Sequence, residues 1–334
     1  MRDDSRVVTA CLLICAAVAI TAALIYTRPV MIPLVLALLL SYLVMPLVDG
    51  LQRRMRAPRG LAVALAFGVV ALCVSLLGML VTSSLRRLAA NADVYKGRIA
   101  ALGDRAVAVL DGWGVDVGQA DALAAVRDLP LLRIAGGAAG SVVDILSNGI
   151  LVLVFVIYLI AGRRPGEARQ GLMGEVDAKV RRYLATKVVA SAATGLLTGV
   201  ILALFGLDLA VVFGVLAFLL NFIPAVGSVI STLLPLPIAL VQLDSTAAIV
   251  GAVLVPGALQ LFIGNVVEPK AMGEGLDLHP ITVLLALIFW GLVWGVAGML
   301  LATPITAVLK IVLSRLEATR PVAELLAGRL PTGV

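Results

Sequence analysis

The chain has 334 residues, of which 61% are hydrophobic and 14% are charged. Soluble domains contain roughly 45–50% apolar and about 25% charged residues, so this composition excludes a soluble globular protein. The formal net charge of +6 comes from local arginine clusters. In a membrane protein such clusters mark cytoplasmic loops, and they give no reason to expect a nucleic-acid partner.

Three apolar runs open the chain, at residues 7–26, 31–51 and 61–83. Each reaches the roughly 20 residues that a transmembrane helix needs. The first follows Arg2 and Arg6 as a signal sequence would, but its length and the lack of a suitable cleavage site predict a retained span. Residues 52–59 contain four arginines, so the positive-inside rule places this loop and the N-terminus in the cytoplasm. Residues 1–84 are therefore predicted to form transmembrane helices 1–3.

The only long polar stretch follows these three spans. Residues 85–140 carry charges of both signs and a few apolar residues at helical spacing, which predicts a small helical extracytoplasmic segment. A segment of this length has too little core for an independent enzyme.

A fourth span at 142–161 returns to the cytoplasm, where Arg163 and Arg164 follow it. Residues 166–187 are amphipathic, which favours a helix along the cytoplasmic interface, with a soluble connector helix as the alternative. Residues 141–187 are therefore predicted to hold transmembrane helix 4 and a cytoplasmic amphipathic helix.

Residues 188–314 form the predicted transport core. Ordinary spans at 188–205 and 247–267 are each followed by an over-long apolar tract, at 209–243 and 280–313. The 36 residues from Pro280 to Arg315 would measure roughly 54 Å as one helix, against a hydrocarbon core of about 30 Å. Glycine, proline and polar residues interrupt both tracts, which predicts two broken, re-entrant hairpins; full spans are the alternative. The polar tail, 315–334, is predicted to be cytoplasmic.

The predicted fold class is therefore an all-α polytopic membrane protein. It has about six full transmembrane helices and two re-entrant hairpins, or alternatively eight spans. One hairpin follows an outward span and the other an inward span, so the C-terminal half forms an inverted repeat, an arrangement that many transporters build around a central site. The spacing of Gly195 and Gly199 also predicts a close helix contact in the span before the first hairpin.

Polar and helix-breaking residues in this half are the candidate solute- or ion-binding residues, because unwound backbone at membrane depth is tolerated where it lines a cavity. These candidates are Asn221, Pro224, Gly227, Gln260, Asn265, Glu268, Gly295, Gly298, Thr303 and Pro304. Asn265 and Glu268 are expected to face a cavity, with Glu268 as the candidate for cation or proton coupling. The alternative is that Glu268 and Lys270 are solvated charges flanking a span. Under the coupling hypothesis, Glu268→Gln abolishes coupling and leaves folding intact.

Other chemistry has no support in the sequence. There is no phosphate-binding loop, no HExxH and no GxSxG. His279 is the only histidine, and it is better explained as the residue that begins a helix than as a proton carrier. Cys11, Cys15 and Cys73 lie in apolar runs and are interpreted as packing residues. We therefore expect no catalytic residues, no metal and no cofactor.

Several segments resemble one family of bacterial transporters. They are NFIPAVGSVISTLLPLPIAL at 221–240, the stretch from NVVEPKAMGEGLDLHP to TPITAVLK at 265–310, TRPVAELL at 319–326, and IPLVLALLLSYLVMPLVDGLQRRMRAPR at 32–59. They are similar to the autoinducer-2 exporter (AI-2E) family. The resemblance implies a transporter of the bacterial inner membrane that exports a small polar quorum-sensing signal or, in some relatives, exchanges Na⁺ or Li⁺ for H⁺. It also implies a homo-oligomer, such as a pentamer.

A function of another class is a membrane scaffold or envelope assembly factor that uses the outer segment as its contact surface. The broken tracts favour transport, because a scaffold has no need of polar breaks inside the membrane. The expected partners are therefore a small polar solute, with or without Na⁺ and H⁺, and the lipid bilayer.

Overall fold

The computed structural model describes residues 2–55, 58–90, 97–98, 149, 151–162, 171–224, 226–272, 276–317 and 319–329, and within these ranges every regular element is a helix. The protein is an all-α polytopic membrane protein, as the sequence predicts. Five of the described helices are long and apolar enough to cross a membrane, namely Arg28–Gln52, Gly60–Ser84, Gly174–Leu204, Thr246–Met272 and Pro280–Leu313. Shorter apolar helices include Ile14–Tyr26 and Leu151–Ala161, at the positions of the first and fourth predicted spans.

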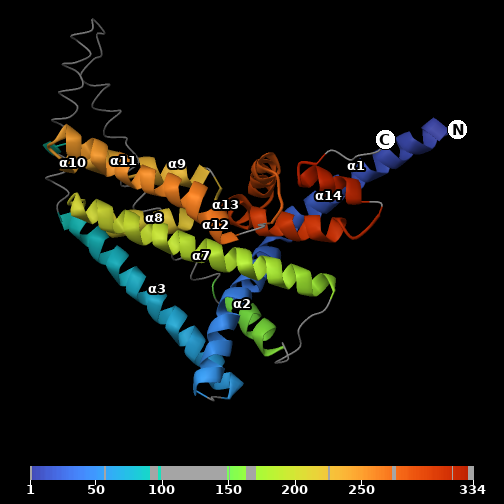
Figure 1. Cartoon of the computed structure of the whole chain (residues 1–334), viewed down its shortest axis with the longest axis horizontal. Helices are drawn as coiled ribbons and strands as arrows, with labels where there is room; N and C mark the ends of the chain where they lie inside the picture. Colours follow the sequence, from blue (N-terminus) through green and yellow to red (C-terminus); the bar gives the residue numbers. More distant parts are fainter. Residues whose placement is uncertain are drawn as a thin grey trace, which may run out of the picture. The chain divides into compact units, whose positions relative to one another are not determined.

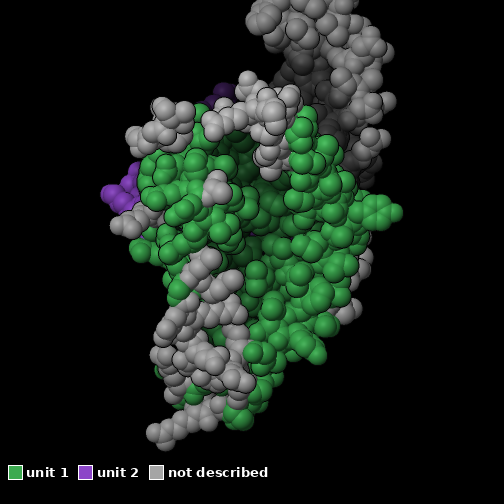
Figure 2. Space-filling view, turned by 90° about the vertical axis from the view of Figure 1, so that its right-hand side faces the viewer, with its two compact units in different colours: residues 1–66, 148–185, 272–334 green, residues 67–147, 186–271 purple. Residues whose placement is uncertain are grey.

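The chain forms two compact units, which Figure 2 colours green and purple. Unit 1 comprises residues 1–66, 148–185 and 272–334, and unit 2 comprises residues 67–147 and 186–271. Each unit is described by itself below. The predicted extracytoplasmic segment, 85–140, lies outside the described residues apart from 85–90 and 97–98, and the start of the predicted amphipathic helix at 166–170 lies outside them as well.

Unit 1 contains the N-terminal helices and the second broken tract. Its helices are α1 (Arg2–Tyr26), α2 (Arg28–Met55), the start of α3 (Arg59–Ala90), the first part of α7 (Leu172–Leu204), α13 (Pro280–Leu313) and α14 (Arg320–Leu326). Pro29 lies in the first turn of α2, where a proline without an amide hydrogen costs no intrahelical bond. Within this unit α13 packs against α1, α2 and α14, and these helices can be followed in Figure 1.

The tract that forms α13 is broken in the middle, as its length predicts. Gly295 has φ 63° and ψ −144°, a conformation that essentially only glycine adopts. Beyond this point the chain folds back. A hydrogen bond shows this, since the Trp290 indole donates to the Thr306 hydroxyl at 3.2 Å. In a straight helix these two residues, 16 positions apart, would be separated by roughly 24 Å. The Lys310 ammonium then donates to the Asp277 carbonyl at 3.0 Å, so the two ends of the tract meet.

Unit 2 contains the rest of α7 and the first broken tract. The tract forms α8 (Ala210–Leu220), α9 (Val226–Leu233) and α10 (Leu236–Gln242), and it is followed by α11 (Thr246–Phe262), the π-helical turn η1 (Ile263–Val267) and α12 (Glu268–Met272). Helix α9 packs against both α8 and α11. The hydrophobic core of unit 2 contains eight buried residues: Leu202, Leu207, Leu209, Ala210, Phe213, Ile238, Ala239 and Ala252.

The first tract is also a hairpin. The Asp208 amide donates to the Gln242 side-chain oxygen at 3.1 Å, which brings the start and the end of the tract together. Helix α8 has 11 residues, about 16 Å, which is too short to cross a hydrocarbon core of about 30 Å. A single full crossing would have placed the two ends on opposite sides, so this geometry favours the hairpin over the full span.

The two hairpins turn in the same way. A Cβ atom built on Gly227 would lie 1.7 Å from the Leu220 carbonyl oxygen, and one on Gly298 would lie 1.9 Å from the Trp290 carbonyl oxygen. In each hairpin the glycine lets the second arm approach the backbone at the end of the first arm, and any side chain there would collide with it. Gly227 and Gly298 therefore each allow close contact between the two arms of their own hairpin.

Helix α7 differs from the sequence-based expectation. It is one continuous helix of 33 residues from Leu172 to Leu204, so the predicted amphipathic helix and the following span are not separated by a break near Lys187. Further along α7, Gly195 makes the predicted close contact, since a Cβ atom there would lie 2.6 Å from the Gly214 carbonyl oxygen of α8.

Candidate functional site

A buried ion pair forms the centre of the candidate site in unit 2. The Lys187 ammonium donates to both oxygens of Glu268, each at 2.8 Å. Lys187 is 6% exposed and Glu268 is 9% exposed. An unpaired charge would be costly in this environment, and a two-point contact with an opposite charge is the geometry that compensates it. The pair is neutral as a whole.

Two uncharged polar side chains complete this cluster. The Asn221 side-chain amide donates to the Glu268 carboxylate and to the Ser191 hydroxyl, both at 3.0 Å. Ser191 is fully buried, and Asn221 is partly buried. The Glu268 carboxylate therefore accepts from an ammonium and an amide, so its charge is both neutralised and hydrogen-bonded. We call Lys187, Ser191, Asn221 and Glu268 the polar cluster.

Three elements bring the polar cluster together. Lys187 and Ser191 lie one turn apart on α7, so they share a face of that helix. Asn221 is the C-terminal cap of α8, at the tip of the first hairpin. Glu268 begins α12, directly after the π-helical turn η1. The tip of the hairpin thus contacts two flanking helices, α7 through Ser191 and α12 through Glu268, by side chains that donate and accept hydrogen bonds.

The π-helical turn has a local cause and a consequence for the site. Pro269 has no amide hydrogen, and in a regular α-helix its ring would collide with the carbonyl four residues earlier, at Asn265. The wider turn at Ile263–Val267 is a common way in which a helix accommodates such a disruption. Because this turn contains an extra residue, Glu268 faces the interior whereas Asn265 is exposed. Asn265 therefore does not share the buried position of Glu268, in contrast to the expectation that both face one cavity.

A second buried polar contact lies nearby in the chain. Gln260 of α11 is 5% exposed and Ser231 of α9 is 3% exposed. The Ser231 hydroxyl lies 2.7 Å from the Gln260 side-chain oxygen. The Gln260 side-chain nitrogen is buried and has no hydrogen-bond partner among the described residues.

The remaining sequence-predicted candidates are not part of the polar cluster. Pro224 and Gly227 shape the turn of the first hairpin, where Pro224 is partly buried and Gly227 is buried. Gly295 and Gly298 shape the turn of the second hairpin. Thr303 and Pro304 are buried in α13, and the Thr303 hydroxyl has no partner among the described residues. These second-hairpin residues belong to unit 1, so a central site shared by the two hairpins of the inverted repeat stays a prediction.

Sequence reasoning missed Lys187 and Ser191. Lys187 was assigned to the end of an amphipathic helix, where a lysine normally faces water. One signal was available, because Lys187, Ser191, Thr194 and Thr198 recur at helical spacing, and all four are at least nine-tenths buried. A polar stripe at this spacing in an apolar helix predicts an interior face.

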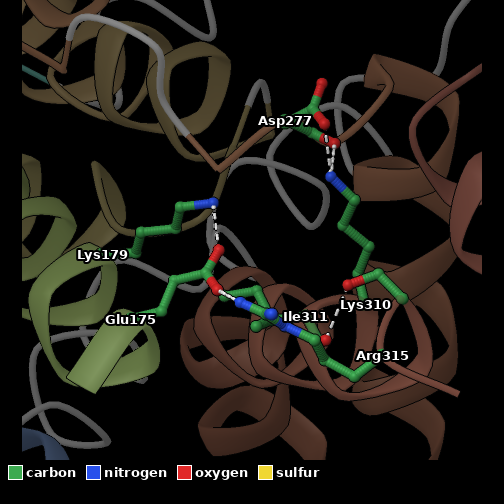
Figure 3. A network of polar contacts seen from close by, with 7 residues as sticks. Glu175, Lys179, Asp277, Lys310, Ile311 and Arg315 are labelled. Carbon is green, nitrogen blue, oxygen red and sulfur yellow. Dashed lines mark hydrogen bonds and ion pairs between the residues drawn. The ribbon is translucent and has the colours of Figure 1, made fainter. Parts of the chain in front are cut away.

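A charged network occupies a different place, in unit 1. It lines a pocket of about 270 Å³, together with apolar and hydroxyl side chains of α13 and α14. Its charged lining residues are Glu175, Lys179, Asp277, Lys310, Arg320, Glu324 and Arg329. Figure 3 shows Glu175 between Lys179 and Arg315, and Lys310 directed at Asp277.

Asp277 forms two of the ion pairs in this network. It has φ 51°, and its carboxylate pairs with Lys310 and with Arg329, the latter at 2.9 Å. Partial burial raises the pKa of Asp277, but the hydrogen bond from Lys310 and the charges of Lys310, Arg329 and Lys179 together hold this pKa below its ordinary value. At neutral pH Asp277 is therefore ionised and joins the start of α13 to its end and to the segment after α14.

His279 lies beside this network at the start of α13. Its ring nitrogen accepts from the Ile281 amide at 3.3 Å, which is the contact of an N-terminal cap. Its own amide donates to the Leu326 carbonyl of α14 at 3.0 Å. His279 therefore begins a helix, as the sequence predicts.

Comparison with known proteins identifies the family of this chain. The chain matches the model of the AI-2E family of transporters over residues 13–318. It is 31% identical to the AI-2 transport protein TqsA of Escherichia coli strain K12 over 317 residues, which cover 90% of each chain. It is 25% identical over 338 residues to a putative transport protein of Haemophilus influenzae, covering 94% of each chain. A putative transport protein of Borreliella burgdorferi is 33% identical over 159 residues, which are 47% of this chain and 44% of the relative. This chain belongs to the AI-2E transporter family.

Proposed function

We propose that this transporter exports a small polar solute of the autoinducer-2 type across the bacterial inner membrane as a secondary transporter, with its N- and C-termini in the cytoplasm. The observation that carries the proposal is the polar cluster at the tip of the first hairpin. A buried lysine, carboxylate, amide and hydroxyl offer both donors and acceptors, which is what a small oxygen-rich solute needs in an apolar surrounding. The relative named as an AI-2 transport protein supports the choice of solute.

The solute would bind by exchanging hydrogen bonds with this cluster. Asn221 donates to both Ser191 and Glu268, so a solute hydroxyl that replaces Asn221 at Glu268 restores the hydrogen bond that it breaks. The hairpin tip that carries Asn221 is then released from α12. Exchange of this kind leaves no buried polar group without a partner, and it links solute binding to movement of the hairpin.

A Na⁺(Li⁺)/H⁺ antiporter is the less favoured function. Glu268 is the carboxylate that such a transporter would use, but its charge is already compensated by Lys187 at 2.8 Å. A cation would have to displace a lysine ammonium that is itself buried, and that displacement leaves Lys187 without a partner. A neutral solute meets no such cost. A membrane scaffold does not need a buried polar cluster, so the scaffold hypothesis leaves the polar cluster unexplained.

The test is transport by the purified protein in liposomes. Autoinducer-2 uptake into these liposomes, measured with and without a proton gradient, is expected for the wild type and is expected to be lost in Asn221→Leu. Asn265→Leu is the matched control, because it makes the same change at an exposed position. Sodium-driven proton movement without autoinducer-2 transport would contradict the proposal and favour the antiporter.

A further inference from the structure

The segment from α11 to α12 has two buried polar side chains, Gln260 on α11 and Glu268 on α12. Its buried residues are Ala252, Pro256 and Gln260, followed by Ile263 in η1 and Glu268 at the start of α12. The spacing is four, four and three residues, and then five across the π-helical turn. In a regular α-helix residues seven apart nearly share a face, whereas residues eight apart do not. The extra residue of the π turn therefore aligns Glu268 with Gln260, and these two residues lie roughly 12 Å apart along the helix.

Gln260 differs from the other buried polar groups that lack a partner. Among the described residues the Thr198 and Thr303 hydroxyls also have none. A threonine hydroxyl in a helix can rotate toward a carbonyl of the preceding turn. The Gln260 amide is at the end of a longer side chain that points to Ser231 of α9. Its nitrogen, Nε2, is therefore not placed to donate to a carbonyl of the preceding turn of its own helix. A buried amide with an unmet hydrogen bond destabilises the protein unless something binds it.

We propose that Gln260 and Ser231 form a second binding station for the transported solute, which receives one of the solute's hydroxyl groups. A hydroxyl both donates and accepts, so it can satisfy the open position of the Gln260 amide while the Ser231 contact persists. Ser231 keeps a partner during the exchange, because its hydroxyl also lies 3.2 Å from the Ser228 carbonyl. The solute class is a small neutral molecule that carries a hydroxyl group. This inference rests on the proposed solute transport.

The two stations give the solute a path along α11. The polar cluster binds it at the tip of the first hairpin, and Gln260 binds it about two turns further along the same face. A distance of roughly 12 Å is longer than one small solute, so the stations are occupied in succession.

The test combines transport with the stability of the solute-free protein. Gln260→Met keeps the length of the side chain and removes both polar atoms. We expect it to weaken the apparent affinity for autoinducer-2 in liposomes about fivefold, the factor of one hydrogen bond. We also expect the Tm of the purified, solute-free variant to equal or exceed that of the wild type, because an unmet amide has been removed.

Gln242→Met is the matched control, since the Gln242 oxygen accepts from the Asp208 amide. It is expected to lower the Tm and to leave the affinity for autoinducer-2 unchanged. A lower Tm for Gln260→Met would assign Gln260 a structural role and overturn the inference, as would an unchanged affinity in a wild-type protein that transports. If the wild type itself does not transport autoinducer-2, the proposed solute is wrong, and the Tm comparison alone then decides whether the Gln260 amide is a structural group.

Discussion

Lys187 and Glu268 lie 81 positions apart in the chain and form a buried pair in which one ammonium contacts both oxygens of one carboxylate. This pair changes what is expected of the Glu268→Gln variant. From the sequence alone, the substitution removes a charge and leaves folding intact. With Lys187 buried opposite, it leaves an ammonium without a counter-charge in the interior of the protein.

We therefore expect Glu268→Gln and Lys187→Met each to lower the free energy of unfolding by about 3–5 kcal/mol. The double variant should recover most of this loss, because it removes both charges together. Thermal unfolding of the four proteins in detergent measures the cycle. Additive losses in the double variant would show that the two charges do not compensate each other.

The hairpin glycines give a second prediction. Gly227→Ala and Gly298→Ala each place a methyl group less than 2 Å from a backbone carbonyl oxygen, so the two arms must separate. The expected loss of stability is about 1–3 kcal/mol or more, together with loss of transport. Gly68→Ala is the control, since a Cβ atom there meets nothing within 4 Å. A Gly227→Ala protein as stable as the control would contradict the tight turn.

The ends of the first tract allow a test of the hairpin in the membrane. In a protein without Cys11, Cys15 and Cys73, cysteines introduced at Asp208 and at Ser245 should both react with an impermeant reagent from the outer side. Asp208 contacts Gln242 through its backbone amide, and Ser245 follows Gln242 closely in the chain, so both positions lie at the joined ends of the tract. Labelling from opposite sides would restore the eight-span arrangement.

The charged network of unit 1 predicts a response to acid. The folded-state pKa of Asp277 lies below its ordinary value of 3.8. Its ion pairs therefore stabilise the fold fully above that ordinary value, and this stabilisation is lost as the pH falls through the lower folded value. Amide hydrogen exchange in α14 should accelerate in Asp277→Asn at about pH 6, and in the wild type only at a pH below the ordinary Asp value of 3.8. Asp244→Asn is the control, as the Asp244 side chain is 95% exposed. Exchange that is equally fast in the wild type and Asp277→Asn at about pH 6 would contradict the role of Asp277.

Much of the fold follows from lengths and breaks that the sequence displays. A tract of 34 residues from Pro280 to Leu313 does not fit the bilayer as a straight helix, and Gly295 lies where it turns. The same reasoning predicted a break in the first tract, where Asn221, Pro224 and Gly227 lie between or at the ends of α8 and α9. The length of a tract and the position of its helix-breaking residues are properties of the local sequence, so the breaks can be predicted without a structure.

The partners within the site were not predictable in the same way. Lys187 lies between an amphipathic and an apolar segment, where hydropathy alone assigns it to water. Its pairing with Glu268 depends on contacts between helices that are distant in the sequence. Asn265 and Glu268 were expected to face one cavity because regular helical spacing gives no sign of a π-helical turn, and a single extra residue is enough to separate their faces.

The neutrality of the pair between Lys187 and Glu268 has a consequence for energetics in a living cell. Moving one elementary charge through the membrane potential costs about 2.3 kcal/mol per 100 mV. A lysine and a carboxylate that move together carry no net charge, so rearrangement of the loaded site does no electrical work. While the pair stays intact, the membrane potential alone should therefore not change the rate at which this protein exports an uncharged solute.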